Sequence, residues 1–135
     1  MDGTAIFNYS SYNGRFRIGD GLYLFETQWT KRSNTTIYCY TDTSSVRGVA
    51  LAPRGAGLSD ITDASALDFT SRTRTAEEGR FVVLQNTNGF YAALQVIEVK
   101  DDAQGDNCDE ITFNYWILTD GGKNFSKVKS SAAVA

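Results

Sequence analysis

The sequence predicts a mainly β fold, either a small antiparallel barrel or a two-layer sandwich, with one short helix. Short runs rich in β-branched and aromatic residues recur along the chain, separated by turns of glycine and asparagine. One stretch alone has its apolar residues at helical spacing. The 135 residues suit a single domain, and 13% aromatic residues supply enough apolar volume for one compact core.

The N-terminal half is expected to supply an edge segment and four strands. Residues 2–11 are polar with scattered aromatics, which suits an edge strand or an arm. The Asn13-Gly14 dipeptide that follows is a turn signal, because both residues tolerate a positive φ. Half-buried strands, in which apolar and polar residues alternate, are predicted at 15–18, 22–29, 35–41 and 46–52.

The short helix is predicted over residues 58–67, where apolar residues recur at helical spacing and Ser59 or Thr62 is a candidate N-cap. The single domain is expected to span residues 1–122. Residues 123–135 are basic and then rich in serine and alanine, so we expect them to form a flexible tail.

Three further strands are predicted in the C-terminal half, at residues 81–85, 90–100 and 111–118. Residues 79–100 run from a glycine through an apolar strand and a tight turn into a long apolar strand (GRFVVL, then GFYAALQVI). This pattern resembles the first hairpin of an SH3-like or Tudor-like barrel, which implies such a barrel here. It does not place the aromatic cage of that family, so it assigns no binding residue. The chain also resembles small bacterial proteins, which implies a bacterial origin.

Composition excludes several classes of function. The chain has no histidine, so it contains neither a Ser-His-Asp triad nor a His-Glu-x-x-His zinc motif. Its net charge is −3, whereas a duplex-binding protein usually carries a positive excess that neutralises phosphates. Nucleic acid is therefore not the expected partner, and no cofactor is expected.

The cysteines and the N-terminus predict a cytoplasmic protein. Cys39 and Cys108 are far apart in sequence, so we expect free thiols rather than a zinc site or a disulfide scaffold. Residues 1–6 lack the basic region and apolar run of a signal peptide. No apolar stretch approaches the ~20 residues of a membrane span. A secreted protein whose signal has been removed is the alternative, against which the initiating Met argues.

Glu98 and Lys100 end a long apolar strand and form the most specific catalytic hypothesis. The Glu-x-Lys pattern resembles the catalytic strand of restriction-type nucleases, in which the carboxylate holds Mg²⁺ and the lysine orients the attacking water. An upstream carboxylate completes that pattern, and Asp68 is the first candidate, with Glu77 or Glu78 as others. The chain lacks the Pro-Asp that the pattern places upstream, and a solvated ion pair is the simpler interpretation.

Two charged clusters are candidate ion-binding sites. Several carboxylates fall within the loop after the long strand, where oxygen ligands would suit Ca²⁺ or another metal ion, although the spacing is not that of an EF-hand. The candidate metal ligands are Asp101, Asp102, Asp106 and Asp109. Arg72 and Arg74 alternate along an extended segment and are candidate ligands of a phosphate or carboxylate. For the acidic loop, the simpler interpretation is a charged hairpin loop that keeps the strand ends soluble and blunts edge pairing. For the arginines, it is pairing with Glu77, Glu78 or the acidic loop.

The strongest binding hypothesis concerns the aromatic residues of the hairpin formed by residues 22–41. If they lie on one face, they form an aromatic wall that suits a ligand or an interface, unless it is the core of the domain. The residues concerned are Tyr23, Phe25, Trp29, Tyr38 and Tyr40.

From these observations we expect a non-enzymatic binding or interaction module that self-associates into a homo-oligomer, such as a dimer, through a strand edge or the aromatic face. A protein or a small molecule remains an alternative partner. A metal-dependent nuclease or hydrolase is the second hypothesis for function. A small-ligand pocket inside the barrel, lined by tyrosine and tryptophan, is the third.

Overall fold

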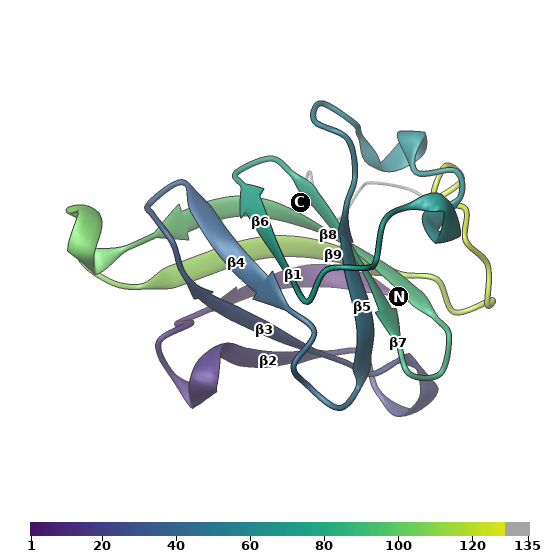
Figure 1. The fold of residues 1–135 in the computed structure, drawn as a ribbon, viewed down its shortest axis with the longest axis horizontal. Coiled ribbons are helices and arrows are strands. Elements are labelled where there is room, and N and C mark those ends of the chain that lie inside the picture. Colours follow the sequence, from purple (N-terminus) through teal and green to yellow (C-terminus); the bar gives the residue numbers. More distant parts are fainter. Residues whose placement is uncertain (129–135) are drawn as a thin grey trace.

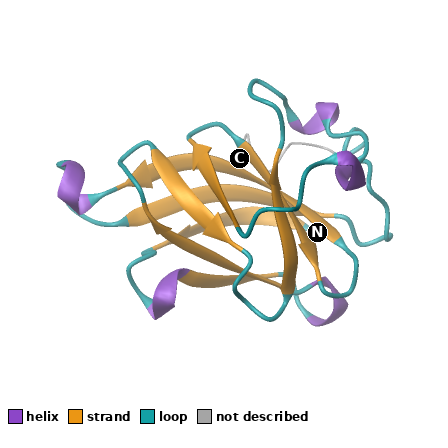
Figure 2. Ribbon diagram, in the orientation of Figure 1, coloured by secondary structure: helices purple, strands orange, loops and turns teal. Residues whose placement is uncertain are grey.

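The computed structural model describes residues 1–128. In this range nine strands form two antiparallel sheets, and five short 3-10 helices lie in the connections between strands (Figures 1 and 2). The two sheets pack face to face, so the predicted sandwich is confirmed, whereas a closed barrel does not form. Within residues 1–128, no helix has the length and apolar character needed to cross a membrane.

The larger sheet has five strands in the order β1-β9-β8-β7-β5. Their bounds are β1 (Asp2–Phe7), β9 (Glu110–Ile117), β8 (Tyr91–Lys100), β7 (Phe81–Asn86) and β5 (Val46–Leu51). The smaller sheet has the order β2-β3-β4-β6. Its strands are β2 (Arg15–Ile18), β3 (Phe25–Lys31), β4 (Thr36–Tyr40) and β6 (Thr73–Glu77). Six of the seven predicted strands are confirmed to within one residue at each end.

The remaining differences concern β3 and β6. Strand β3 begins three residues later than predicted, because Gly21–Tyr23 form a 3-10 turn, η2, that is held by the hydrogen bond from the Tyr23 amide to the Asp20 carbonyl. Strand β6 has no counterpart among the predicted strands, since its sequence TRTAE is mostly polar. Its pairing with β4, from Thr36 opposite Glu77 to Tyr40 opposite Thr73, makes this segment a strand.

The main core lies between the two sheets. Trp29 from the smaller sheet packs against Phe113 from the larger one, with ring centroids 5.3 Å apart. The Trp29 Nε1–H donates to the Thr27 hydroxyl at 2.8 Å, and that hydroxyl in turn donates to the Phe16 carbonyl. The polar atoms of this buried pair are therefore satisfied, as burial requires.

A second core covers the outer face of the larger sheet. There, Trp116 and Phe81 pack against segments that precede β6 and follow β9, including the fully buried Phe125. Residues 123–128, which were predicted to belong to a flexible tail, thus contribute to this core. The rest of that predicted tail, residues 129–135, lies outside the described residues.

The predicted helix over residues 58–67 is wrong. Two single-turn 3-10 helices replace it, η3 (Leu58–Asp60) and η4 (Ala64–Ala66). The backbone groups that would close an α-helix are engaged elsewhere, because the Ala64 amide donates to the Lys123 carbonyl and the Ile61 carbonyl accepts from the Phe125 amide. The helical spacing of apolar residues reflects burial against the sheet, where Leu58, Ile61 and Ala64 belong to the second core.

Candidate binding surface

The register of β3 and β4 divides the predicted aromatic wall between two faces. Trp29 lies opposite Cys39, while Thr30 lies opposite Tyr38. Because side chains alternate along a strand, this register turns Phe25 and Trp29 inward, where both are fully buried. Neither is accessible to a ligand or a partner, so the expectation of a single exposed wall is corrected for these two residues.

Tyr23 also lies apart from the other tyrosines. It belongs to η2 and packs edge-on against Phe90, with ring centroids 4.9 Å apart and an interplanar angle of 80°. The Leu22 side chain beside it is exposed, while the Leu22 carbonyl accepts hydrogen bonds from the Asn86 and Asn88 side chains.

Tyr38 and Tyr40 lie on the outer face of the smaller sheet and are each half-buried. Their ring centroids are 6.3 Å apart. The Arg32 guanidinium lies 5.9 Å from the Tyr38 ring, and the Arg72 guanidinium lies 5.7 Å from the Tyr40 ring. Both distances are those of cation–π contacts. Together with Asp42, these four residues form a surface that we call the Tyr-Arg face.

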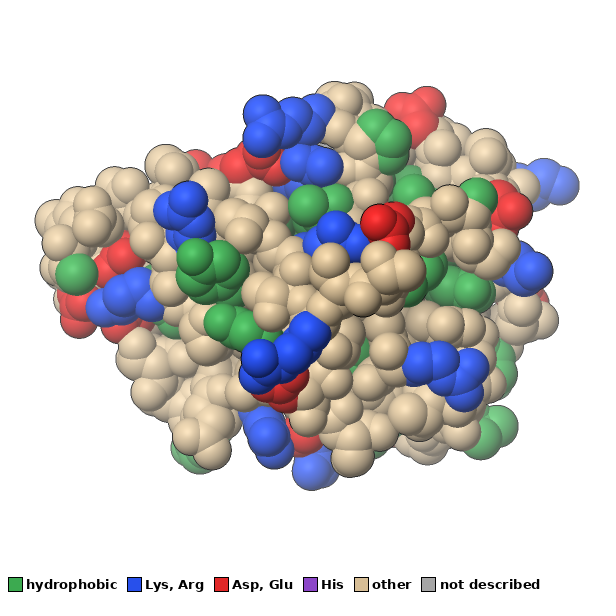
Figure 3. Space-filling view, viewed as in Figure 1, with side chains coloured by type: hydrophobic (Ala, Val, Ile, Leu, Met, Phe, Trp, Pro, Cys, Tyr) green, Lys and Arg blue, Asp and Glu red, His purple; other side chains and the backbone are tan. Residues whose placement is uncertain are grey.

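Charge is distributed unevenly along the Tyr-Arg face. The Arg72 guanidinium donates two hydrogen bonds of 2.7 Å to the Asp42 carboxylate. These bonds lower the pKa of the Asp42 carboxyl below its ordinary value. Arg32 forms no salt bridge with any residue in the range 1–128. Figure 3, which looks onto β4, shows hydrophobic side chains over this strand with basic side chains on either side. The face thus has a guanidinium without a salt bridge at one end and the Arg72–Asp42 ion pair at the other.

The predicted arginine pair does not form a joint anion site. Arg72 binds Asp42, whereas Arg74 donates to the Asp68 carbonyl at 2.6 Å and lies 3.3 Å from the Asp68 carboxylate. The pKa of Asp68 is lowered mainly by a hydrogen bond from the Thr70 hydroxyl, and further by one from the Thr70 amide and by Arg74. Each guanidinium is therefore occupied by a different acid of the same chain.

Residues of the nuclease hypothesis are brought together only in part. Glu98 is exposed, and the Lys100 ammonium lies 3.6 Å from the Glu110 carboxylate. Asp68 is distant from this strand end, because its neighbour Phe69 packs on Tyr91, about 23 Å before Glu98 at ~3.3 Å per residue.

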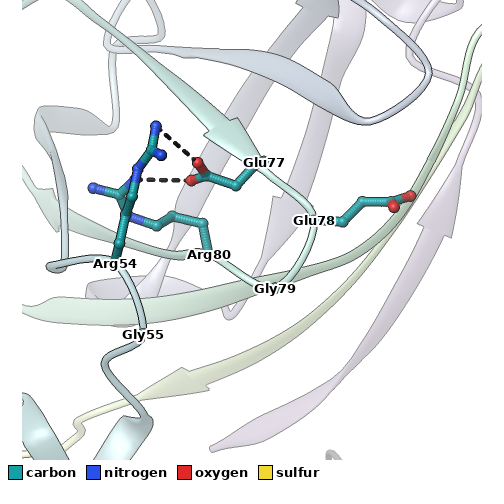
Figure 4. A pocket seen from close by; sticks show the side chains of 6 residues that line it. All are labelled: Arg54, Gly55, Glu77, Glu78, Gly79 and Arg80. Atoms are coloured by element: carbon teal, nitrogen blue, oxygen red, sulfur yellow. Dashed lines mark hydrogen bonds and ion pairs between the residues drawn. The ribbon is translucent and has the colours of Figure 1, made fainter.

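Of the other upstream acids, Glu78 does reach this strand. Its carboxylate accepts a hydrogen bond of 2.9 Å from the Val99 amide. Glu77 lines a hollow of about 410 Å³, where it pairs with Arg80 at 2.8 Å and with Arg54 at 3.3 Å (Figure 4). Two arginines thus share the single Glu77 carboxylate in that hollow, because Glu78 points away from them (Figure 4).

Three of the four candidate metal ligands in the acidic loop lie together around a lysine. Carboxylate oxygens of Asp101, Asp102 and Asp109 lie within 4.8 Å of one another. The Lys31 ammonium at the end of β3 lies 3.3, 2.8 and 3.2 Å from these three carboxylates, respectively. Asp106, the fourth predicted ligand, instead accepts a hydrogen bond from the Asp101 amide. An ion pair network thus occupies the predicted metal site.

Electrostatics in this cluster favour its charged form. Burial opposes ionisation of Asp109, but hydrogen bonds from the Ser10 hydroxyl, the Asp102 amide and Lys31 outweigh it and lower the pKa to about 2. The hydrogen bond to Asp102 is the main cause that raises the pKa of Lys31. The cluster therefore stabilises the contact between β3 and the loop before β9.

A second hollow, of about 340 Å³, lies on the outer face of the larger sheet. Its walls include Phe81, Gln95 and Trp116. The buried Trp116 Nε1 has no hydrogen-bond partner within residues 1–128. This hollow lies outside the space between the sheets, where core side chains occupy the position of the predicted internal pocket.

Both cysteines are free thiols, as predicted, and their reactivities should differ. Cys39 is fully buried, and burial raises its pKa to about 12, whereas Cys108 is partly exposed. Because the thiolate is the reactive form, we expect Ellman's reagent to modify Cys108 in the native protein and Cys39 only after unfolding. Rapid modification of both thiols without denaturant would show that the β4 core opens readily.

Sequence reasoning missed three residues that the structure places at these sites, namely Lys31, Arg32 and Asp42. Lys31 and Arg32 lie between the strands predicted at 22–29 and 35–41, and no local pattern links Lys31 to acids some 70 positions away. Comparisons with protein-family models, with curated proteins and with solved structures found no match to this chain.

Proposed function

We propose that this protein is a non-enzymatic interaction module that self-associates through the Tyr-Arg face. The observation that carries the proposal is the pair of tyrosine rings on the outer face of the sheet, each beside an arginine guanidinium. Tyrosine and arginine are enriched in protein interfaces and among the residues that contribute most to binding. Both offer large contact areas together with a polar group that remains hydrated until the partner arrives.

The size of the face sets the expected strength of association. Strands are ~4.8 Å apart and rise ~3.3 Å per residue, so the four strands, which average about five residues, cover ~330 Å². A standard stable interface buries about 800 Å² on each partner. We therefore expect a weak dimer that forms at micromolar to millimolar concentrations rather than an obligate one.

Sedimentation equilibrium over that concentration range tests the proposal. The weight-average mass should rise from 14.8 kDa toward twice that value. Tyr38→Glu and Tyr40→Glu should each hold the protein at the monomer mass, because a carboxylate in the centre of the contact is desolvated without a partner. Tyr12→Glu is the matched control, since Tyr12 is 85% exposed and lies outside the face.

Two results would contradict the proposal. A wild-type protein that stays at 14.8 kDa up to millimolar concentration does not self-associate. A dimer that withstands both substitutions in the face uses a different surface. Circular dichroism of each variant would show that the fold is retained.

Both alternative functions have less support. A nuclease has less support because Lys100 pairs with Glu110 and because Asp68 lies far from Glu98. Nicking of a plasmid in the presence of Mg²⁺ or Mn²⁺ would support the nuclease hypothesis. A small ligand in the hollow at Trp116 would change tryptophan fluorescence. The resemblance of residues 79–100 to an SH3-like hairpin and a cytoplasmic, bacterial setting accord with the interaction module, which depends on neither.

A further inference from the structure

Charge is unbalanced in the hollow that Arg54 and Arg80 line. Both guanidiniums pair with the single carboxylate of Glu77, at 3.3 and 2.8 Å, respectively. The neighbouring acid, Glu78, extends away from the arginines, and its carboxylate accepts a hydrogen bond from the Val99 amide instead (Figure 4). Two cations therefore face one anion in a hollow of about 410 Å³, which leaves one positive charge uncompensated.

Arg80 is held in place by the protein itself. Its side chain is only 14% exposed, its Nε–H donates to the Ala52 carbonyl at 2.6 Å, and its Nη1 donates to Glu77 at 2.8 Å. Its Nη2 has no hydrogen-bond partner within residues 1–128 and remains accessible to solvent. A guanidinium carries five N–H donors in a rigid fork, so the free edge of this fixed group is available to an acceptor from outside the chain.

Arg54 also lines the hollow, but a single contact holds it. Its side chain is 82% exposed and reaches Glu77 as an ion pair at 3.3 Å. The residue lies in a turn that is closed by the hydrogen bond from the Ala56 amide to the Pro53 carbonyl, in which Gly55 has a φ of 81°. Rotation of the Arg54 side chain can therefore bring a second guanidinium to an anion at the cost of one exposed ion pair.

From this arrangement we infer that the hollow is a binding site for a small phosphate anion, held jointly by the guanidiniums of Arg54 and Arg80. A phosphate group presents three acceptor oxygens and nearly two negative charges, so it accepts from both planar forks at once. The Glu77 carboxylate orients Arg80, while its own charge limits the affinity. The residues of this hollow do not belong to the Tyr-Arg face, so the inference is independent of the proposed function.

Calorimetric titration of the full chain with inorganic phosphate, glycerol 3-phosphate and acetate tests this site. We expect millimolar binding of the two phosphates and weaker binding of acetate, which has two oxygens and a single charge. Tighter binding of glycerol 3-phosphate than of inorganic phosphate would assign the site to a phosphate monoester, and equal affinities would assign it to free phosphate. Absence of phosphate binding at millimolar concentrations and low salt would overturn the inference.

Substitutions in the hollow should change phosphate affinity in opposite directions. Arg54→Gln and Arg80→Gln should each weaken binding by about tenfold, because each removes a hydrogen bond between charged groups. Glu77→Gln should instead tighten binding by about threefold, because it removes the nearest negative charge while its amide oxygen still accepts from Arg80. A purely structural ion-pair cluster predicts no such gain.

Arg47→Gln is the matched control, since Arg47 is exposed, lies outside the hollow and donates to the Thr87 carbonyl. This variant should bind phosphate as the wild type does. Circular dichroism would show whether Arg80→Gln, which also loses the bond to Ala52, retains the fold; Arg54→Gln and Glu77→Gln keep the test decisive if it does not. Unchanged affinity in Arg54→Gln and Glu77→Gln would mean that phosphate binds elsewhere, and the assignment to this hollow would be wrong.

Discussion

Replacing Trp29 by alanine is expected to destabilise the fold by about 3–5 kcal/mol, the typical cost of truncating a large buried aromatic side chain. Trp29 is fully buried at the junction of the two sheets and packs on Phe113. Such a loss is a large fraction of the ~5–15 kcal/mol by which domains are usually stable. The Thr27 hydroxyl keeps its bond to the Phe16 carbonyl, so the loss comes from the cavity rather than from an orphaned hydroxyl.

Urea unfolding at neutral pH measures this effect, and Tyr38→Ala is the matched control. Tyr38 is a half-buried aromatic residue on the outer face, and we expect its removal to cost about 1 kcal/mol or less. Should Trp29→Ala fail to fold, Trp29→Phe keeps a ring in the core and should be intermediate. Equal losses for Trp29→Ala and Tyr38→Ala would mean that the assignment of inner and outer faces is wrong.

Replacing Lys31 by methionine is expected to lower stability at neutral pH and to raise the pKa of Asp109. The substitution removes the ammonium from three carboxylates, of which Asp101 and Asp109 are nearly inaccessible to solvent. Carboxylates that cluster without a cation disfavour one another's ionisation. The loss at pH 7 should therefore exceed that of an ordinary surface ion pair.

The sign of the pH dependence follows from Asp109. Its pKa in the folded protein, about 2, lies below its ordinary 3.8, so its ionisation stabilises the fold above pH 4 and this contribution is lost as pH falls from 4 to 2. The difference in melting temperature between wild type and Lys31→Met should accordingly be largest above pH 4 and shrink below it.

Lys100→Met is the control for this prediction, since Lys100 pairs with a single half-exposed acid at 3.6 Å and should matter little. Melts with millimolar Mg²⁺, Mn²⁺ or Ca²⁺ should not stabilise the wild type, because the Lys31 ammonium already occupies the carboxylate cluster. A rise of several degrees with one of these ions would show that the ion displaces Lys31, and the predicted metal site would be correct.

The strands were predictable because their signals are local. Runs such as Thr36–Tyr40 and Tyr91–Lys100 combine β-branched and aromatic residues between turn residues, and the structure makes both of them strands. The helix prediction was wrong for a non-local reason. Spacing reports which residues are buried, but the backbone of residues 61–64 pairs with residues 123–125, which no local pattern contains.

The candidate site shows the same division. From the sequence alone, the tyrosines of β4 were identified as binding candidates, and the clustered acids as a loop that attracts cations. The sequence also determined a mainly β fold without histidine chemistry. Only the tertiary structure decided that Trp29 faces the core while Tyr38 faces outward, because strand register selects the face and register depends on pairing with β4. It also decided that Lys31 fills the acidic cluster, since that contact joins segments separated by some 70 residues and depends on how the sheets pack.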